Sequence, residues 1–386
     1  MIDFTLTEND QRILDEIRRQ SLVCRQYARY YDEHEDEFPP DRLPEAADFR
    51  NPYKVVDVPD DGDTPRRVLH MLVAACQAWG DYGVMMKRGQ RALGNLVLDV
   101  AGTPEQQQRW GHLTLAIAIT EPGCGSDAKT LRTSAVLDGD EWVLNGEKIF
   151  VTTGCRCDGI VAAATIDRSA GYRAIHPFVV LKGTPGFEVT HREKKLGIHA
   201  DDTATMVFQD ARIPRDQLLG GDEKSTGGFS AVMSALNATR PAVGIAGLGI
   251  AQAALDFTRE QLALEGIEVE WSAGIRSRSA AQQALIEIEA DIEAALLDML
   301  YAAWLSDGST WQRLETTIAK AKSGEVARSA VRRCLDLLGA LGISHDYLVE
   351  KWFRDARITD LYGGTGEIQR LIIAREILGY SSAELS

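Results

Sequence analysis

The repeat of apolar residues changes twice along the chain, near residue 113 and near residue 226. Before the first change, segments such as "TENDQRILDEIRRQSLVCRQYARYYDEH" repeat apolar residues every three or four positions behind a cap-like Thr7, which predicts helices. From "LTLAIAITEPG" to "MVFQDARIP", short runs rich in Val, Ile and Thr alternate with Gly, Asp and Asn, as in strands. The helical repeat returns after the glycine-rich "GGDEKSTGG". We therefore predict a helical N-terminal domain over 1–112, an all-β middle domain over 113–225 and a helical C-terminal domain over 226–386.

Within the middle region, "SAVLDGDEWVLNGEKIFVTT" contains two dipeptides that are typical of tight turns. Asp138-Gly139 and Asn145-Gly146 both favour hairpin turns between half-buried strands. The segment therefore predicts two hairpins, one at each dipeptide.

Composition excludes several classes of protein. The formal net charge of −15 argues against general binding to nucleic acid or to an anionic membrane, because long-range repulsion must first be overcome. The six cysteines are scattered, and the pair Cys155 and Cys157 lacks a second pair or a histidine cluster at zinc spacing, so we expect no metal site. The start "MIDFTLTENDQR" is polar, and no run of about 18 apolar residues occurs. We expect a cytoplasmic protein without a membrane segment.

Two segments of the middle region have the chemistry of a ligand site. "AITEPGCGSDAKTL" leaves a strand and enters a turn with Gly123, Gly125 and Ser126, where glycines expose amide N–H groups and admit an anionic ligand close to the backbone. The alternative is a tight loop between strands. "KIFVTTG" places Phe150 and Thr152 on a strand. These residues suit a flat heterocycle, or else they are ordinary core and strand-surface residues.

The third segment is "TDLYGGTGEIQR", residues 359–370. Its double glycine is typical of a backbone that something approaches closely. Thr365 and Glu367 lie just before the apolar helix "IQRLIIAREIL", and a helix N-terminus suits a phosphate or a carbonyl oxygen.

Four segments, taken together, resemble the acyl-CoA dehydrogenase family: "AITEPGCGSD", "LNGEKIFVTTG", "LGIHADDTATMVFQDARIP" and "RDARITDLYGGTGEIQRLIIAREILG" occur in the family's order and spacing. The resemblance extends from about residue 5 to 380 and is strongest after residue 90. It implies an α+β multidomain subunit with an N-terminal helical domain, a middle β-barrel domain and a C-terminal four-helix-bundle domain. It also implies FAD as cofactor, an acyl-CoA thioester as substrate, an electron-transfer flavoprotein as acceptor, and assembly into a homo- or hetero-oligomer.

The resemblance also assigns roles to individual residues. It places the cofactor beside Ile119 and Thr120 (flavin ring), Gly125 and Ser126 (pyrophosphate or CoA thioester arm), Phe150 (stacked on the flavin, where most members have tryptophan), Thr152 (near flavin N5), and Thr365 and Glu367 (adenosine side). It implies that the substrate contacts Ser126, Arg240, Tyr362 and Gly363, with Arg240 near the CoA arm.

The family's catalytic base is missing from both of its usual positions. The family reaction removes the α proton of the acyl group with a carboxylate while the β hydrogen leaves as hydride. The base must be ionised and close to the α carbon. The two positions that carry it in the family are Gly363 and Thr239 here, so the catalytic residue is unknown.

Segments that face a neighbouring subunit in the family also depart from its pattern. "EGIEVEWSAGIRSRSAAQQ" replaces an arginine-aromatic-glycine segment, Asp336, Gly339 and Ala340 stand where a glutamine and a glycine pair are usual, and Asn237 replaces an aspartate. An aspartate facing a pyrophosphate would be repelled.

Four interpretations follow from these departures. The chain is a dehydrogenase with a base from elsewhere, or one subunit of a heteromeric acyl-CoA dehydrogenase whose partner supplies the base. It is otherwise a relative with changed chemistry, such as a desulfinase, a reductase or a monooxygenase, or a structural subunit without flavin.

Overall fold

The computed structural model describes residues 4–37, 65–86, 91–307, 312–381 and 384, which form two compact units. The helical unit comprises the described residues of Met1–Arg88, Lys195–Ala200 and Thr239–Ser386, and the sheet unit comprises those of Gly89–Lys194 and Asp201–Ala238. The first unit therefore contains helices from both ends of the chain. The three domains predicted from the sequence are contiguous ranges, whereas each of these units combines separate segments of the chain. The predicted domain boundaries therefore stay a prediction.

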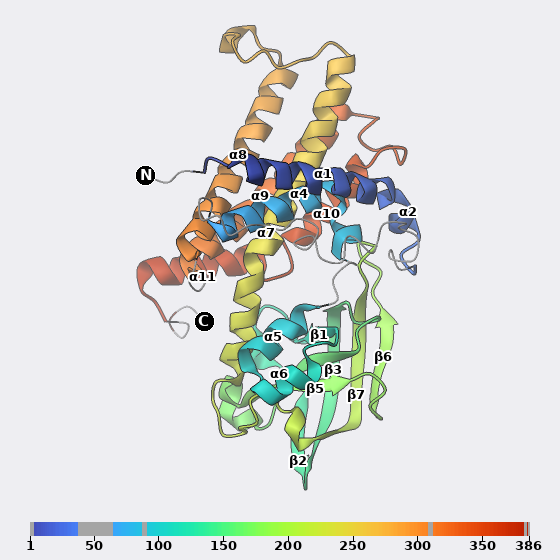
Figure 1. Cartoon of the computed structure of the whole chain (residues 1–386), viewed down its shortest axis with the longest axis vertical. Helices are drawn as coiled ribbons and strands as arrows, with labels where there is room; N and C mark the ends of the chain where they lie inside the picture. Colours follow the sequence, from blue (N-terminus) through green and yellow to red (C-terminus); the bar gives the residue numbers. More distant parts are fainter. Residues whose placement is uncertain (1–3, 38–64, 87–90, 308–311, 382–383, 385–386) are drawn as a thin grey trace. The chain divides into compact units, whose positions relative to one another are not determined.

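The helical unit is built from helices, and those that begin at Arg66, Gly228, Ala280, Arg313 and Val349 share one large core. Its helices are α1 (Glu8–Gln26), α2 (Ala28–Glu33), α4 (Arg66–Met86), α8 (Ala280–Ser306), α9 (Arg313–Leu338), α10 (Val349–Thr359), α11 (Gly366–Leu378) and the part of α7 (Gly228–Leu264) that follows Ala238 (Figure 1). Thr7 is the N-cap of α1, as predicted, and forms a capping box with Asp10.

Helix α7 owes its close packing to small residues. A Cβ on Gly249 would lie 2.4 Å from the carbonyl oxygen of Ala75, so only glycine fits between α7 and α4. By length and composition α7 is apolar enough to cross a membrane, but 78% of its apolar window is buried inside the protein. That degree of burial is typical of a core helix.

The sheet unit holds one curled sheet with the order β1-β4-β2-β3-β7-β6, and β5 pairs with β4. Helix α5 (Leu93–Ala101) packs on β1 and β4, and α6 (Pro104–Trp110) follows it (Figure 1). Among the strands described, β6 pairs with neither β1 nor β5, so the predicted barrel-like domain is a curled sheet that backbone pairing does not close. The strands are β1 (Leu115–Ala118), β2 (Ser134–Asp138), β3 (Glu141–Thr152), β4 (Gly159–Thr165), β5 (Ile175–Leu181), β6 (Phe187–Arg192) and β7 (Thr203–Pro214).

One predicted hairpin is confirmed and the other is wrong. Strands β2 and β3 pair down to Asp138 and Glu141, so the first turn lies where it was predicted. At Asn145-Gly146, however, β3 continues without a turn up to Thr152. Gly146 is needed for a different reason, because a Cβ there would lie 2.4 Å from the hydroxyl of Thr133. Asn145 exchanges hydrogen bonds with Asp210, the positive-φ residue of a bulge in β7.

The segment Lys195–Ala200 belongs to the helical unit although it joins two strands. His199 holds it there. Its Nδ1 lies 3.0 Å from the carbonyl oxygen and 3.1 Å from the carboxylate of Asp32, and its Nε2 lies 2.7 Å from the carbonyl oxygen of Lys195. All of these oxygens only accept hydrogen bonds, so the arrangement favours the protonated imidazole, in which both ring nitrogens donate. The hydrogen bond to Asp32 raises the pKa of His199, although burial opposes it.

This geometry predicts that His199 stabilises the helical unit below neutral pH. A group with a raised folded-state pKa contributes fully below its unfolded pKa of about 6.5 and stops contributing as pH rises through the folded pKa. We expect the His199→Gln variant to lose on the order of 1 kcal/mol near pH 6 and little at pH 9. Urea unfolding of wild type and of His199→Gln between pH 6 and pH 9 measures the difference in free energy of unfolding. The neighbouring ion pairs, in which Arg29 and Arg354 each contact Asp32 and Glu350, are the same in wild type and variant. If the two proteins showed the same dependence of stability on pH, the prediction would be contradicted.

Candidate functional site

The loop that carries Ile119 to Ser126 is fixed beside strand β3. The amide of Ile149 donates to the carbonyl oxygen of Thr120 at 2.8 Å, and the Lys148 ammonium donates to that of Ile119 at 3.0 Å. Glu121 and Cys124 then close a tight turn through two backbone hydrogen bonds. The structure therefore places Ile119 and Thr120 beside Lys148 and Ile149, which immediately precede Phe150.

Phe150 is exposed by a bulge in β3. In the ladder with β7, Lys148 pairs with Met206 and Val151 with Ala204, so one extra residue lies between them. Phe150 has φ 56°, a left-handed conformation that is unfavourable for an aromatic residue. Its side chain is 58% exposed. An exposed ring on a strained backbone is typical of a functional position.

This face of the sheet unit fits a flavin. The exposed Phe150 ring offers a flat apolar surface for stacking, and the hydroxyl-bearing Thr152 follows two residues later, half-buried on β3. Gly125 and Ser126 are exposed, and a Cβ on Gly125 would meet nothing within 4 Å. A phosphate therefore has access to the backbone there.

The second group of predicted residues lies in the helical unit, at the start of α11. Thr365 is the N-cap of this helix and its hydroxyl accepts from the amide of Ile368 at 3.3 Å. Glu367 is exposed in the first turn. In the described parts of the chain, no protein acceptor is recorded for the amides of Gly363, Gly364 and Thr365. These N–H groups are therefore available to an oxygen atom of a ligand.

Both family positions for the base lie near each other on this unit. A Cβ on Gly363 would contact the side chain of Val243 at 3.4 Å, and Val243 stands four residues after Thr239 on α7, hence on the same helix face. Neither position carries a carboxylate. Asp360 lies nearby but is paired with Arg357 at 3.0 Å, so the described residues offer no obvious replacement.

Arg240 is a half-buried cation that has no acidic partner among the residues that the structure describes. Its guanidinium bonds the hydroxyl of Thr317 at 3.3 Å, its Nε is buried without a partner, and it forms no ion pair with a carboxylate of the described residues. Burial and the neighbouring Arg313 lower the pKa of Arg240 to about 10. A cation in this state suits an anionic or carbonyl oxygen ligand.

The sequence did not identify the buried ion pair that supports the flavin-facing loop. Lys148 and Glu121 lie 2.7 Å apart with side chains 0% and 7% exposed. The Glu121 carboxylate also accepts from the amides of Arg132 and Thr133. Burial would raise the pKa of Glu121, but Lys148 and these hydrogen bonds lower it. The alternation of residues along β3 could have revealed this buried lysine, because Lys148 occupies an inward position like Trp142 and Leu144.

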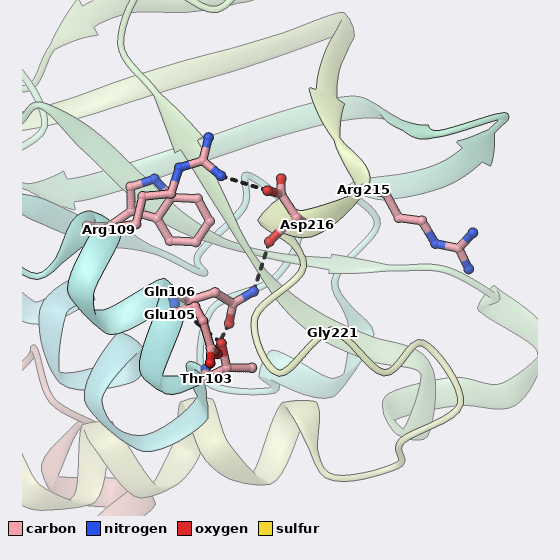
Figure 2. A pocket seen from close by; sticks show the side chains of 8 residues that line it. Thr103, Glu105, Gln106, Arg109, Arg215, Asp216 and Gly221 are labelled. Atoms are coloured by element: carbon pink, nitrogen blue, oxygen red, sulfur yellow. Dashed lines mark hydrogen bonds and ion pairs between the residues drawn. The ribbon is translucent and has the colours of Figure 1, made fainter.

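A pocket of about 420 Å³ in the sheet unit is not part of this site (Figure 2). Arg109 pairs with Asp216 across it at 2.6 Å, and Arg215 pairs with Glu223, so both of its arginines have acidic partners. No residue predicted for the site lines it. The lining residues are Thr103, Glu105, Gln106, Arg109, Trp110, Arg215, Asp216 and Gly221.

Comparison with known proteins identifies the family. Residues 116–211 match the acyl-CoA dehydrogenase middle domain, and residues 226–378 match the acyl-CoA dehydrogenase C-terminal domain. The chain is 37% identical over 283 residues to the mitochondrial short-chain specific acyl-CoA dehydrogenase of Bos taurus, covering 72% of this chain and 67% of that one. It is 35% identical over 296 residues to the acryloyl-CoA reductase (NADH) of Anaerotignum propionicum, covering 72% and 71%. The structure of butyryl-CoA dehydrogenase from Megasphaera elsdenii superposes with a TM-score of 0.79 at 28% identity, covering 98% and 100%. The chain belongs to the acyl-CoA dehydrogenase family.

Proposed function

We propose that this protein binds FAD and an acyl-CoA thioester and works in α,β-desaturation as one subunit of a heteromeric acyl-CoA dehydrogenase. Its partner, a second chain of the same fold, supplies the catalytic carboxylate. One observation carries this proposal: the residues assigned to the flavin are present, with an exposed Phe150 in place of the usual tryptophan, whereas Thr239 and Gly363 leave the site without its base. An electron-transfer flavoprotein is the proposed acceptor, in keeping with the family.

The chain's own residues have the following roles in this reaction. Phe150 and Thr152 hold the flavin ring, and Thr365 and Glu367 hold the adenosine side. FAD held there would supply the acceptor for the hydride that leaves the β carbon. The amides of the Gly363 turn donate to the thioester carbonyl oxygen, which makes the α proton more acidic by stabilising the negative charge that develops on that oxygen. Arg240 binds the CoA arm.

Reduction of an unsaturated acyl-CoA is a second candidate, supported by the relative that is an acryloyl-CoA reductase. This direction needs a proton donor at the α carbon, and the same two positions, Thr239 and Gly363, again lack one. The missing carboxylate therefore points to a partner subunit in either direction.

An absorption spectrum of the purified chain tests the proposal. We expect bound oxidised flavin that does not bleach anaerobically with a panel from butyryl-CoA to palmitoyl-CoA, and that bleaches once the partner subunit is added. Bleaching of the chain alone would contradict the heteromeric proposal and require an unrecognised base. A colourless protein that takes up no added FAD would favour a structural subunit.

A further inference from the structure

Two buried side chains donate hydrogen bonds to the backbone carbonyl groups of the turn formed by Gly363 and Gly364. The Lys320 ammonium, on α9, donates to the carbonyl oxygens of Gly364 at 2.7 Å and of Asp360 at 3.2 Å. The Gln369 amide, on α11, donates to those of Gly363 at 3.1 Å and Gly364 at 3.0 Å. Both side chains belong to residues that are 0% exposed. Together they capture the carbonyl groups of two successive peptide units.

Neither glycine can be replaced without strain. Gly363 has φ 69° and Gly364 has φ 90°, values that L side chains rarely adopt. A Cβ on Gly364 would also lie 2.5 Å from Nε2 of Gln369. The turn and Gln369 are therefore fitted to each other.

Burial of the Lys320 ammonium in this place is unfavourable for the free energy of folding. Among the described residues its ammonium has hydrogen bonds only to the two carbonyl oxygens and none to a carboxylate. Burial, together with the neighbouring Arg240, lowers the pKa of Lys320 to about 8, although Asp360 and Glu367 oppose this. A buried cation without a bonded carboxylate is unfavourable for folding, so stability alone does not account for it.

The hydrogen bonds to the carbonyl groups of Gly363 and Gly364 also determine where the N–H groups of Gly364 and Thr365 point. Across a trans peptide the C=O and N–H bonds point in opposite directions. Because the carbonyl oxygens of Gly363 and Gly364 face Lys320 and Gln369, the N–H groups of Gly364 and Thr365 face away from them. In the part of the chain that the structure describes, these N–H groups have no recorded protein acceptor.

We propose that Lys320 and Gln369 are positioning residues of the substrate site, which fix the peptide planes of the Gly363-Gly364 turn so that its N–H groups face the acyl thioester. This inference rests on the proposed function, because it takes the turn to bind the thioester. Neither residue touches the substrate. Lys320 and Gln369 should therefore affect the affinity for the thioester carbonyl and not the affinity for the rest of CoA.

Calorimetric binding of acyl-CoA and of free CoA tests this role on the FAD-loaded protein. The thioester that binds wild type most tightly in the panel from butyryl-CoA to palmitoyl-CoA is the probe, and free CoA lacks the carbonyl. We expect Gln369→Leu and Lys320→Met each to bind the thioester about tenfold more weakly, with the affinity for free CoA changed less than about twofold. Gln369→Glu keeps the shape but loses the donor, so it should behave like Gln369→Leu.

Gln106 provides a matched control. It is a buried glutamine of the sheet unit whose Nε2 donates to the carbonyl oxygens of Asp216 (Figure 2) and Leu218, both at 2.8 Å. Gln106→Leu should lower the urea midpoint but leave the thioester-to-CoA affinity ratio unchanged. If Gln369→Leu, Gln369→Glu and Lys320→Met all keep the wild-type ratio, the inference is overturned and the proposed function stands. If wild type binds no thioester more tightly than CoA, both are overturned.

Discussion

Replacing Gly363 by glutamate is expected to give the chain a desaturase activity at least about 10²-fold above wild type, because general-base catalysis contributes about 10²–10⁴-fold. The new side chain has room, since its Cβ would contact only the Val243 side chain at 3.4 Å or more. Nearby cations, Arg240 and Lys320, favour the ionised carboxylate that a base must be. The measurement is anaerobic flavin bleaching by the acyl-CoA panel, on the chain expressed without a partner.

Backbone strain limits this gain. Gly363 has φ 69°, and a left-handed conformation costs a non-glycine residue about 1–2 kcal/mol. Thr239→Glu tests the other family position without that strain, because residue 239 lies within the helix α7. Residue 239 is buried, however, so its carboxylate needs the same cations to remain ionised.

Gly363→Gln is the matched control for the first variant. It carries the same backbone strain and nearly the same volume but has no basic group. Activity in the glutamate variant and none in the glutamine variant would show that only the carboxylate was missing. No activity from glutamate at either position would mean that the site has been reshaped for another reaction.

The second large effect concerns the ion pair under the flavin-facing loop. Lys148→Met should destabilise the protein by about 3–5 kcal/mol, since it leaves the Glu121 carboxylate buried and unpaired. The variant should also bind FAD more weakly, because the ammonium group holds the carbonyl oxygen of Ile119. Urea unfolding at fixed protein concentration and FAD titration of the apoprotein measure the two effects.

A double variant separates the ion pair from general packing. Glu121→Gln combined with Lys148→Met removes both charges and keeps one of the two oxygens, so the side chain still accepts from the amide of either Arg132 or Thr133. We expect it to be more stable than Lys148→Met alone, with a coupling between the two positions of about 0.5–3 kcal/mol. If Lys148→Met alone lost less than about 1 kcal/mol, the pair would not support the loop as described.

Much of the candidate site follows from segments that are local in sequence. The motifs "AITEPGCGSD" and "KIFVTTG" place Thr120 and Phe150, and the structure brings these residues together through the hydrogen bond from Ile149 to Thr120. The left-handed conformation of Phe150 could not be predicted in this way. It arises from a bulge that forms only against β7, more than 50 residues later in the chain.

The sequence by itself determined the order of helical and β regions, the family, and the absence of the base at Thr239 and Gly363, because each of these depends on residue identity and on periodicity within a short window. Only the tertiary structure decided that Asn145-Gly146 is not a turn, since the close approach of Thr133 and the pairing with Asp210 involve distant residues. The same holds for Lys148 with Glu121, and for Lys320 and Gln369 behind the double glycine. Buried polar groups are hydrogen-bonded in folded proteins. Because their partners here are not adjacent in sequence, the sequence alone could not predict them.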